Sequence, residues 1–307
     1  MKRLVLSIAI ITAVFSASAQ TFVKPELKKG DVAHYENETT MKISLPMGSG
    51  TKQVKTTYLS TITVKDVNDK GALLEDVTSK LNIEGEAVLA GNTLGAGKYL
   101  VDTPILLQTD KNGKLIKIVN YNDIIAKISK GAIADIEKLY KENPALKKNV
   151  SKAKLIMALS TKFSEENLLK TFMQTGIYSV YGKTFKNGNS EIREFNGLKI
   201  KTTWGISSIL GTTSIVGNSK ANMNSAETKD YIFNQLKEQG LDDDAIQNIK
   251  NNWEQLKQMG LDKVDANITE HILLSSKKMV TNYSTKAKMM VMGSEVELNS
   301  NTKLLDK

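Results

Sequence analysis

The stretch YLSTITVKDVNDKG, residues 58–71, decides the fold class of this chain. Its even-numbered residues 58–64 would share one face of an extended segment and its odd-numbered residues 59–65 the other. This period of two, with several β-branched side chains, predicts a strand. Asn68-Asp69-Lys70-Gly71 then places Gly where a hairpin loop needs a positive φ. We therefore predict a β-hairpin that continues into the residues that follow.

Strand patterns of the same kind extend over about residues 30–119. A second turn signal, Asp110-Lys111-Asn112-Gly113, separates two further alternating runs. Strand patterns return over about 183–217 and about 268–305. Because short turns join these runs, we expect antiparallel hairpins rather than parallel strands.

Two regions carry a helical period instead. From Asn122 onward, apolar residues recur at steps of three and four, which predicts helices over about 122–182. We expect Asn122 to cap the first helix, a second helix to run from Ala145 to about Ser160, and Ser164 to cap the third. The same period over about 226–260 predicts a helical hairpin.

Together these patterns predict an α+β fold, with a curved antiparallel β-sheet, half-barrel-like, built from hairpins and with helices packed on one face. The chain has 307 residues and no cysteine, so no disulfide can hold the fold. A chain of this size buries roughly 75% of its unfolded surface, so a core alone is sufficient. We expect residues 20–307 to form a single domain.

The first nineteen residues predict a secretory signal peptide. Lys2 and Arg3 precede the uncharged run Leu4–Phe15, and Ala17-Ser18-Ala19 supplies the small residues of a cleavage site. The apolar run is shorter than the about 20 residues that a membrane span needs. We therefore expect cleavage near Ala19-Gln20 and a periplasmic or secreted protein with no transmembrane span.

The formal net charge is +9, spread as single Lys residues along the chain. Spread charge is typical of a soluble surface. The chain has an export signal and no Arg-rich or aromatic-interleaved basic motif. Nucleic acid is therefore not an expected partner.

No motif predicts a catalytic residue, a metal site or a cofactor. The Ser-x-x-Lys matches, such as Ser275-x-x-Lys278, lack the companion elements of penicillin-recognising serine enzymes. The only histidines, His34 and His271, have none of the spaced partners that indicate zinc. Two distant carboxylates, as in glycoside hydrolases, need no local spacing, so that reaction class stays open.

The segment Met289-Met290-Val291-Met292 is apolar on both faces of one predicted strand. Such a strand is covered on both faces, either by helices or by a bound apolar ligand. Methionine also suits a tolerant groove for a lipid or a hydrophobic peptide, because its side chain is flexible and polarizable. Met289, Met290 and Met292, together with Trp204, are therefore the candidate ligand-binding residues.

The chain resembles a class of uncharacterised exported proteins of Bacteroidota, a domain of unknown function. The resemblance rests on Ser18-Ala19-Gln20, Lys29-Gly30-Asp31, Asp110-Lys111-Asn112-Gly113 and Phe163-Ser164-Glu165-Glu166. It implies no established activity. The layout is also similar in architecture to lipoprotein carriers and related lipid binders, in which a curved antiparallel sheet over helices forms an apolar half-barrel. Likeness of this kind implies a fold and does not fix a function.

Three hypotheses for the function follow. The first is an exported, non-enzymatic protein that binds a hydrophobic small molecule or a lipid between its sheet and its helices. The second is a structural or interaction protein of the cell envelope, with an envelope protein as its partner. The third is a hydrolase with distant carboxylates.

Overall fold

The computed structural model describes residues 20–44, 50–85, 95–142, 144, 152–153, 156, 163–174, 176–195, 197–238 and 243–305. Most of the strands are long and belong to one sheet. They are β2 (Val32–Ser44), β3 (Thr51–Asn68), β4 (Gly71–Gly85), β5 (Pro104–Thr109), β6 (Leu115–Ile118), β8 (Ser190–Phe195), β9 (Leu198–Ile209), β10 (Thr212–Ala221), β11 (Val264–Leu274), β12 (Val280–Val291) and β13 (Ser294–Leu304).

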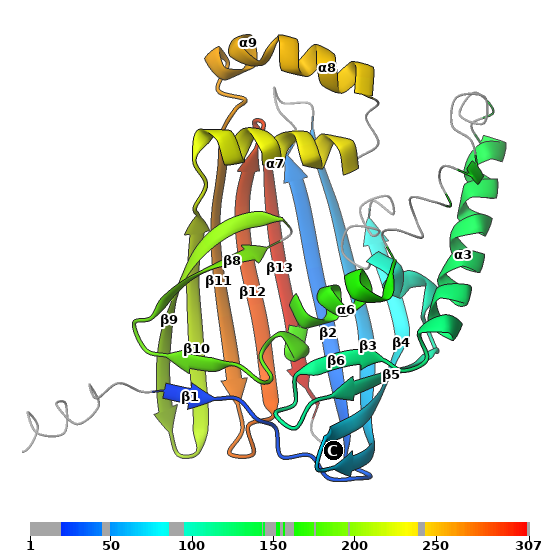
Figure 1. The fold of residues 1–307 in the computed structure, drawn as a ribbon, viewed down its shortest axis with the longest axis vertical. Helices are drawn as coiled ribbons and strands as arrows, with labels where there is room; N and C mark the ends of the chain where they lie inside the picture. Colours follow the sequence, from blue (N-terminus) through cyan, green and yellow to red (C-terminus); the bar gives the residue numbers. More distant parts are fainter. Residues whose placement is uncertain are drawn as a thin grey trace, which may run out of the picture.

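This sheet has 11 strands in the order β6-β5-β4-β3-β2-β13-β12-β11-β10-β9-β8, and every described pair is antiparallel. It therefore consists of two meanders, β2 to β6 and β8 to β13, which join where β2 pairs with β13. The sheet is open and curved (Figure 1). The predicted α+β class with a curved antiparallel sheet is confirmed.

The predicted hairpins lie where the turn signals placed them. Asn68 pairs with Gly71 across the turn between β3 and β4, and the Asp110–Gly113 turn joins β5 to β6. Two strands extend past their predicted limits. β10 continues to Ala221, and β11 begins at Val264 because Ala266, which is fully buried, extends its alternation toward the core.

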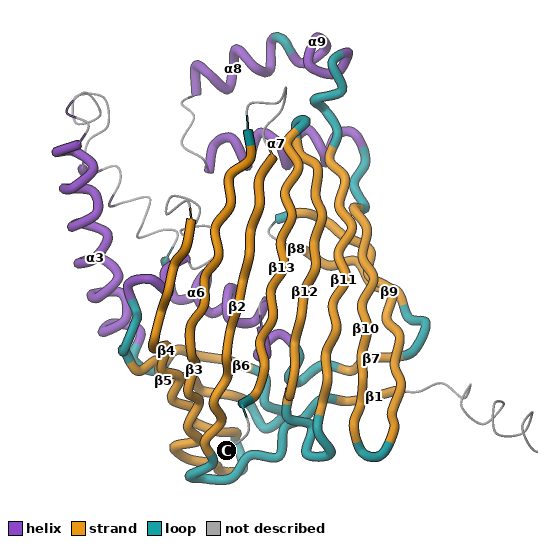
Figure 2. Tube along the Cα trace, turned by 180° about the vertical axis from the view of Figure 1, so that it is seen from behind, coloured by secondary structure: helices purple, strands orange, loops and turns teal. Residues whose placement is uncertain are grey.

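The two faces of the sheet differ sharply in polarity. On the outer face, charged side chains pair across strands, as Lys55 does with Glu38 at 2.8 Å and Lys288 with Glu295 at 2.8 Å. The described helices leave that face uncovered (Figure 2). The inner face carries the core, which includes Ile62, Leu74 and Ile272. Alternation thus gives a sheet that is solvated on one side only.

The connection between the meanders explains why helices cover one face. β6 and β8 lie at opposite edges of the sheet, so the chain between them must cross the sheet. It contains α3 (Tyr121–Glu142), α6 (Glu165–Gln174), the 3-10 turn η3 (Gly176–Ser179) and β7 (Thr184–Lys186). β7 pairs with β1 (Gln20–Phe22) in a separate two-stranded sheet. Figure 1 shows α6 and β1 in front of the large sheet, and β7 lies there too because it pairs with β1. A further 3-10 turn, η2 (Gly95–Tyr99), precedes β5.

The helix predictions hold with one correction at a helix start. α3 buries the expected stripe, including Ile124, Ile128 and Ala132, but it begins at Tyr121, so Asn122 is not its cap. Asn120 precedes the helix and its side chain accepts from the Leu106 N–H, so this Asn ties the helix start to β5. Ser164 caps α6 by accepting from the Asn167 N–H at 3.3 Å. The helix predicted from Ala145 to Ser160 lies almost entirely outside the described residues.

The predicted helical hairpin is present as three helices, α7 (Ser225–Glu238), α8 (Asp243–Asn251) and α9 (Trp253–Gln258). Its second arm is interrupted at Asn252, which separates α8 from α9. The arms meet through Phe233 and Trp253, whose ring centroids are 5.3 Å apart. Figure 1 shows this group at one end of the sheet, opposite the β9–β10 and β11–β12 turns.

Candidate functional site

A partly enclosed cavity of about 310 Å³ lies between the inner face of the sheet and η3, at the end where β2 begins and β13 ends. Most of its lining is apolar or aromatic. These residues are Pro25, Leu27, Val32, Ala33, Tyr35, Ile62, Val64, Leu74, Gly113, Ile177, Tyr178, Tyr181, Met279, Leu304 and Leu305.

The cavity has an apolar floor and a charged mouth. Its deepest lining includes Tyr35, Val64 and Leu74, each 3% exposed or less. Lys277 and Glu26 are exposed lining residues. This gradient from buried carbon to solvated charge suits an elongated ligand with one polar end.

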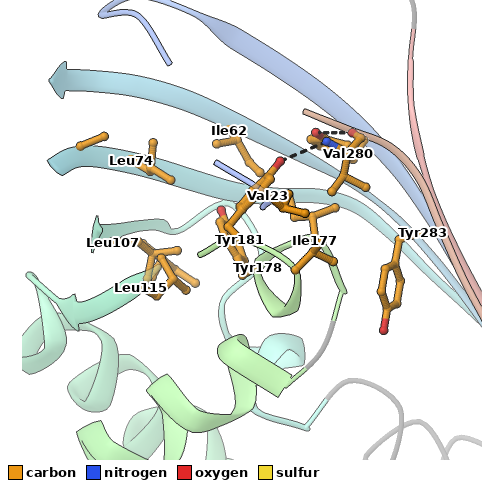
Figure 3. Close-up of a cluster of buried hydrophobic side chains, with 14 of the residues drawn as sticks. Val23, Ile62, Leu74, Leu107, Leu115, Ile177, Tyr178, Tyr181, Val280 and Tyr283 are labelled. Atoms are coloured by element: carbon orange, nitrogen blue, oxygen red, sulfur yellow. Dashed lines mark hydrogen bonds between the residues drawn. The ribbon is translucent and has the colours of Figure 1, made fainter. Parts of the chain in front are cut away.

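Three tyrosines surround the cavity, and the protein itself engages their hydroxyl groups. The Tyr35 hydroxyl donates to the Val280 carbonyl at 2.9 Å, and the Val280 N–H donates to the Tyr181 hydroxyl at 3.3 Å (Figure 3). Burial raises the pKa of Tyr181 to about 12. Because these polar atoms already have partners, the tyrosines contribute chiefly ring carbon to the lining.

Tyr178 contacts β4, in the other half of the sheet from the Tyr181 contact with β12. Its hydroxyl donates to Asp76 of β4 at 2.9 Å, and the Ser60 hydroxyl donates to the second oxygen of the same carboxylate at 2.6 Å. Burial raises the pKa of Asp76, while both hydrogen bonds oppose that shift. Residues 176–181, which we call the crossing segment, are thus tied to β4 through Tyr178 and to β12 through Tyr181.

A second buried carboxylate, Glu270 of β11, lies elsewhere on the inner face. It forms an ion pair with Arg193 of β8 and accepts a hydrogen bond from the Tyr283 hydroxyl at 2.6 Å. Four strands separate β11 from β4 in the sheet order. At about 4.8 Å per strand, Glu270 and Asp76 are too far apart along the sheet to act as one hydrolytic pair. They are the two acidic side chains that the described structure buries.

The methionines named from the sequence lie away from this cavity. Met289 packs on the inner face against Leu198 and Ile268, under the α7 end of the sheet. Met290 lies on the outer face and is 45% exposed. β12 ends at Val291, so Met292 lies in the β12–β13 turn and packs against the α7–α9 group. The expectation that helices or a ligand cover both faces of this strand is therefore wrong for the outer face at Met290.

Trp204 also lies outside the cavity lining. It is 6% exposed, and its ring packs edge-on against Phe185 of β7 at 4.8 Å. Its indole N–H donates to Glu191 at 2.9 Å. Gly217 lies directly opposite on β10, and a Cβ there would come within 2.5 Å of the ring. Trp204 therefore fixes β7 to the inner face, and its assignment to a ligand stays a prediction.

His34 lies next to the inner-face residues Ala33 and Tyr35 and is among the residues that line the cavity, whereas His271 is not. His34 and His271 are exposed, and His34 forms a hydrogen bond of 3.0 Å with Thr61 across the β2–β3 pair. Within the described ranges, no group of three or more acidic, His or Cys side chains is placed to hold a metal ion. Nor does any helix in those ranges have the length and hydrophobicity needed to cross a membrane.

Sequence reasoning missed the residues that form the cavity. Tyr35 belongs to a predicted strand, but Ile177, Tyr178 and Tyr181 follow the third helix in a run without a clear period. An apolar and aromatic run with neither helical nor strand period, inside a connection that must cross a sheet, was the available signal. Only the tertiary structure brings these side chains to β2, β3 and β4.

Comparisons with known proteins assign no family. No family model matches the chain, and no curated protein matches it. A structure of lipovitellin, described as showing lipid–protein interactions, is 9% identical with a TM-score of 0.42, over 92% of this chain and 26% of that chain. DynF, from the dynemicin biosynthesis pathway of Micromonospora chersina, is 6% identical with a TM-score of 0.20, over 95% of this chain and 88% of that chain. This chain thus spans about a quarter of the lipovitellin chain, and neither likeness identifies what the protein does.

Proposed function

We propose that this protein is a non-enzymatic binding protein that holds a hydrophobic small molecule, or one acyl chain of a lipid, in the cavity beneath the crossing segment. The observation that carries the proposal is the cavity itself, about 310 Å³ with a predominantly apolar lining. Pockets for small ligands begin at about 300 Å³. An apolar cavity of about 150 Å³ stays dry and binds benzene, so a larger one has room for a longer apolar group.

The energetics favour an apolar chain in this position. Each methylene removed from water contributes about 0.8 kcal/mol. The hydroxyl groups of Tyr35 and Tyr178 already donate to protein acceptors, so a ligand without polar groups leaves neither donor unpaired. Lys277 at the mouth is exposed and cationic, and Glu26 beside it is exposed and anionic, so a polar end of the ligand would lie at the mouth and not on the apolar floor.

We place this function outside the cytoplasm, on the pattern of residues 1–19. That segment has the order of a secretory signal, so the mature chain would begin near Gln20 and meet its ligand in the periplasm or beyond the cell. Determination of the N-terminus of the protein after export tests this placement.

Filling the cavity tests the ligand proposal. Ala33 is half-buried, lies on the inner face and lines the cavity, so Ala33→Phe adds a ring to the space that a ligand would occupy. We expect this variant to lose most of the binding of a fluorescent fatty acid in a titration, at least tenfold in Kd, because the ring and the acyl chain compete for the same volume.

The matched control is Ala126→Phe on the exposed side of α3, which should bind as the original chain does. Circular dichroism and urea unfolding of both variants establish that each is folded. Equal binding by the two folded variants, or no binding by the original chain, would reject the proposal. In the second case the envelope interaction protein becomes the better hypothesis, to be pursued by crosslinking in the envelope.

A further inference from the structure

The hairpin between β9 and β10 ends in an exposed apolar tip, Ile209-Leu210-Gly211. Leu210 is 100% exposed and Ile209 is 70% exposed. Ile209 pairs with Thr212, so Leu210 and Gly211 form a two-residue loop. Both have positive φ, 49° and 80°, as in the turn type for which Asn-Gly is preferred. A bulky residue at such a position is unusual and gains nothing from burial here.

A second hairpin in the same sheet shows how packing can compensate for a bulky side chain at a positive φ. Met292 and Gly293 form the β12–β13 loop with φ of 50° and 74°. Met292 also stands where Asn is preferred, but it packs against the α7–α9 group. Leu210, at the other end of the sheet, packs against nothing in the described structure. No described residue thus covers Leu210, which leaves its side chain available to a partner.

Two lysines flank the tip. The β11–β12 turn lies beside it, since a Cβ at Gly211 would be 3.6 Å from the Ser276 Cβ and the Lys278 ammonium donates to Thr213 at 3.3 Å. This turn carries Lys277 and Lys278, and neither lysine has a salt-bridge partner among the residues that the structure describes. Both turns lie at the same end of the sheet (Figure 1).

We propose that the tip inserts into the interface of an anionic lipid bilayer while Lys277 and Lys278 contact its headgroups. Exposed leucine and isoleucine beside lysine are the combination that binds such a surface, apolar side chains entering the acyl boundary and ammonium groups meeting the phosphates. A second protein copy would have to cover the same lysines, which carry charge of one sign. The charge complementarity therefore favours an anionic membrane over self-association.

The position of the tip gives this contact a consequence. Lys277 also lines the mouth of the cavity, so a bilayer at the tip would lie beside that mouth. An apolar ligand would then pass between bilayer and cavity with little exposure to water. The membrane contact itself rests on the tip alone and does not require an occupied cavity.

Flotation with lipid vesicles tests the contact. The full protein, with its N-terminus determined, is mixed with vesicles of phosphatidylcholine alone or of phosphatidylcholine with phosphatidylglycerol. We expect binding to the anionic vesicles, weakened by high salt because the lysine contribution is screened. Leu210→Asn should weaken that binding about tenfold or more, since the leucine burial is lost.

Leu210→Asn is chosen because it should remain folded, so that weaker vesicle binding cannot be attributed to unfolding. Asn is favoured at this positive φ, so Leu210→Asn should unfold at the same or a higher urea concentration. The matched control is Ile192→Thr on edge strand β8, where the side chain is 64% exposed and away from the tip. We expect vesicle binding by this variant to be unchanged.

Equal vesicle binding by Leu210→Asn and the original chain, or no binding to anionic vesicles, would overturn the proposal. A tip-dependent dimer in sedimentation would also overturn it, in favour of a second copy of the chain. The cavity-filled variant Ala33→Phe should float as the original chain does. Failure of the ligand proposal and failure of the membrane proposal are therefore distinguishable.

Discussion

At the scale of single residues, Asp76 is the most unusual group of the inner face. The residue is 9% exposed in an otherwise largely apolar region, and two hydroxyl groups donate to its carboxylate. Burial disfavours the charged carboxylate, and the hydrogen bonds from Ser60 and Tyr178 only partly compensate, so its pKa is raised. A group of this kind makes stability depend on pH.

The sign of that dependence is predictable. Because the pKa of Asp76 is higher in the folded chain, its contribution is fully present below the unfolded pKa of about 3.9 and is lost as pH rises through the folded value. Asp76→Asn does not titrate, and the hydroxyl groups can rotate to suit its amide. Relative to this variant, the original chain should lose about 1.4 kcal/mol per unit of pKa difference as pH rises.

Urea unfolding of both chains from about pH 4 to about pH 8 measures this difference. If the free energy of unfolding of the original chain minus that of Asp76→Asn stays constant, or increases as pH rises, the assignment is contradicted.

At this scale the sequence predicted which residues form strands better than it predicted where strands and helices begin and end. Alternation correctly placed Ser60, Ile62 and Val64 on one face of β3, and the structure shows that this face is the buried one. Alternation could not show that Met292 lies in a turn, because an apolar residue at this position fits the end of a strand equally well. The cap of α3 was wrong, since the residue before the helix is Asn120, two positions ahead of Asn122, and its side chain accepts a tertiary hydrogen bond from the Leu106 N–H of β5.

At the scale of elements, the crossing segment is the part that forms the cavity roof. Tyr178 ties it to β4, and Tyr181 ties it to β12, with three strands between those two in the sheet. Phe172 of α6 also packs edge-on against Tyr178, at 6.4 Å between ring centroids. The segment thus connects both halves of the sheet across the join between β2 and β13.

Removing one of these ties should lower stability measurably. Tyr178→Phe leaves the buried carboxylate of Asp76 without one of its two donors, which costs about 1–3 kcal/mol. The free energy of unfolding from urea titration is the measurement. Tyr58→Phe is the matched control, because its hydroxyl forms no hydrogen bond with the residues that the structure describes. We expect a change below about 0.5 kcal/mol for this variant. If both variants lose the same free energy of unfolding, the Tyr178–Asp76 hydrogen bond does not stabilise the fold.

Hairpins could be predicted from the sequence, but the crossing segment could not. A hairpin is formed by residues close together in the sequence, and turn residues such as Asn68 and Gly71 predict it. The pairing of β2 with β13 is the most distant in the sequence, and no local pattern marks it. The same holds for η3, whose three buried residues are explained only by the sheet beneath them.

At the scale of the whole molecule, the fold is a one-sided sheet whose two meanders meet in the middle. Because the connection between meanders must cross from edge to edge, one face is covered and the other is free. The cavity lies where that cover meets the ends of β2 and β13, and it takes residues from the start, the middle and the end of the chain. Because these residues are far apart in the sequence, sequence reasoning did not find them and named Met289, Met290, Met292 and Trp204 as the ligand-binding candidates instead.

The most direct test of the binding proposal is native mass spectrometry of the protein purified from its own source without detergent, followed by solvent extraction. We expect a reproducible added mass that extracts into organic solvent. It should be retained in Ala126→Phe and absent from Ala33→Phe. A clean mass for the original chain, with no extractable adduct, would contradict the proposal.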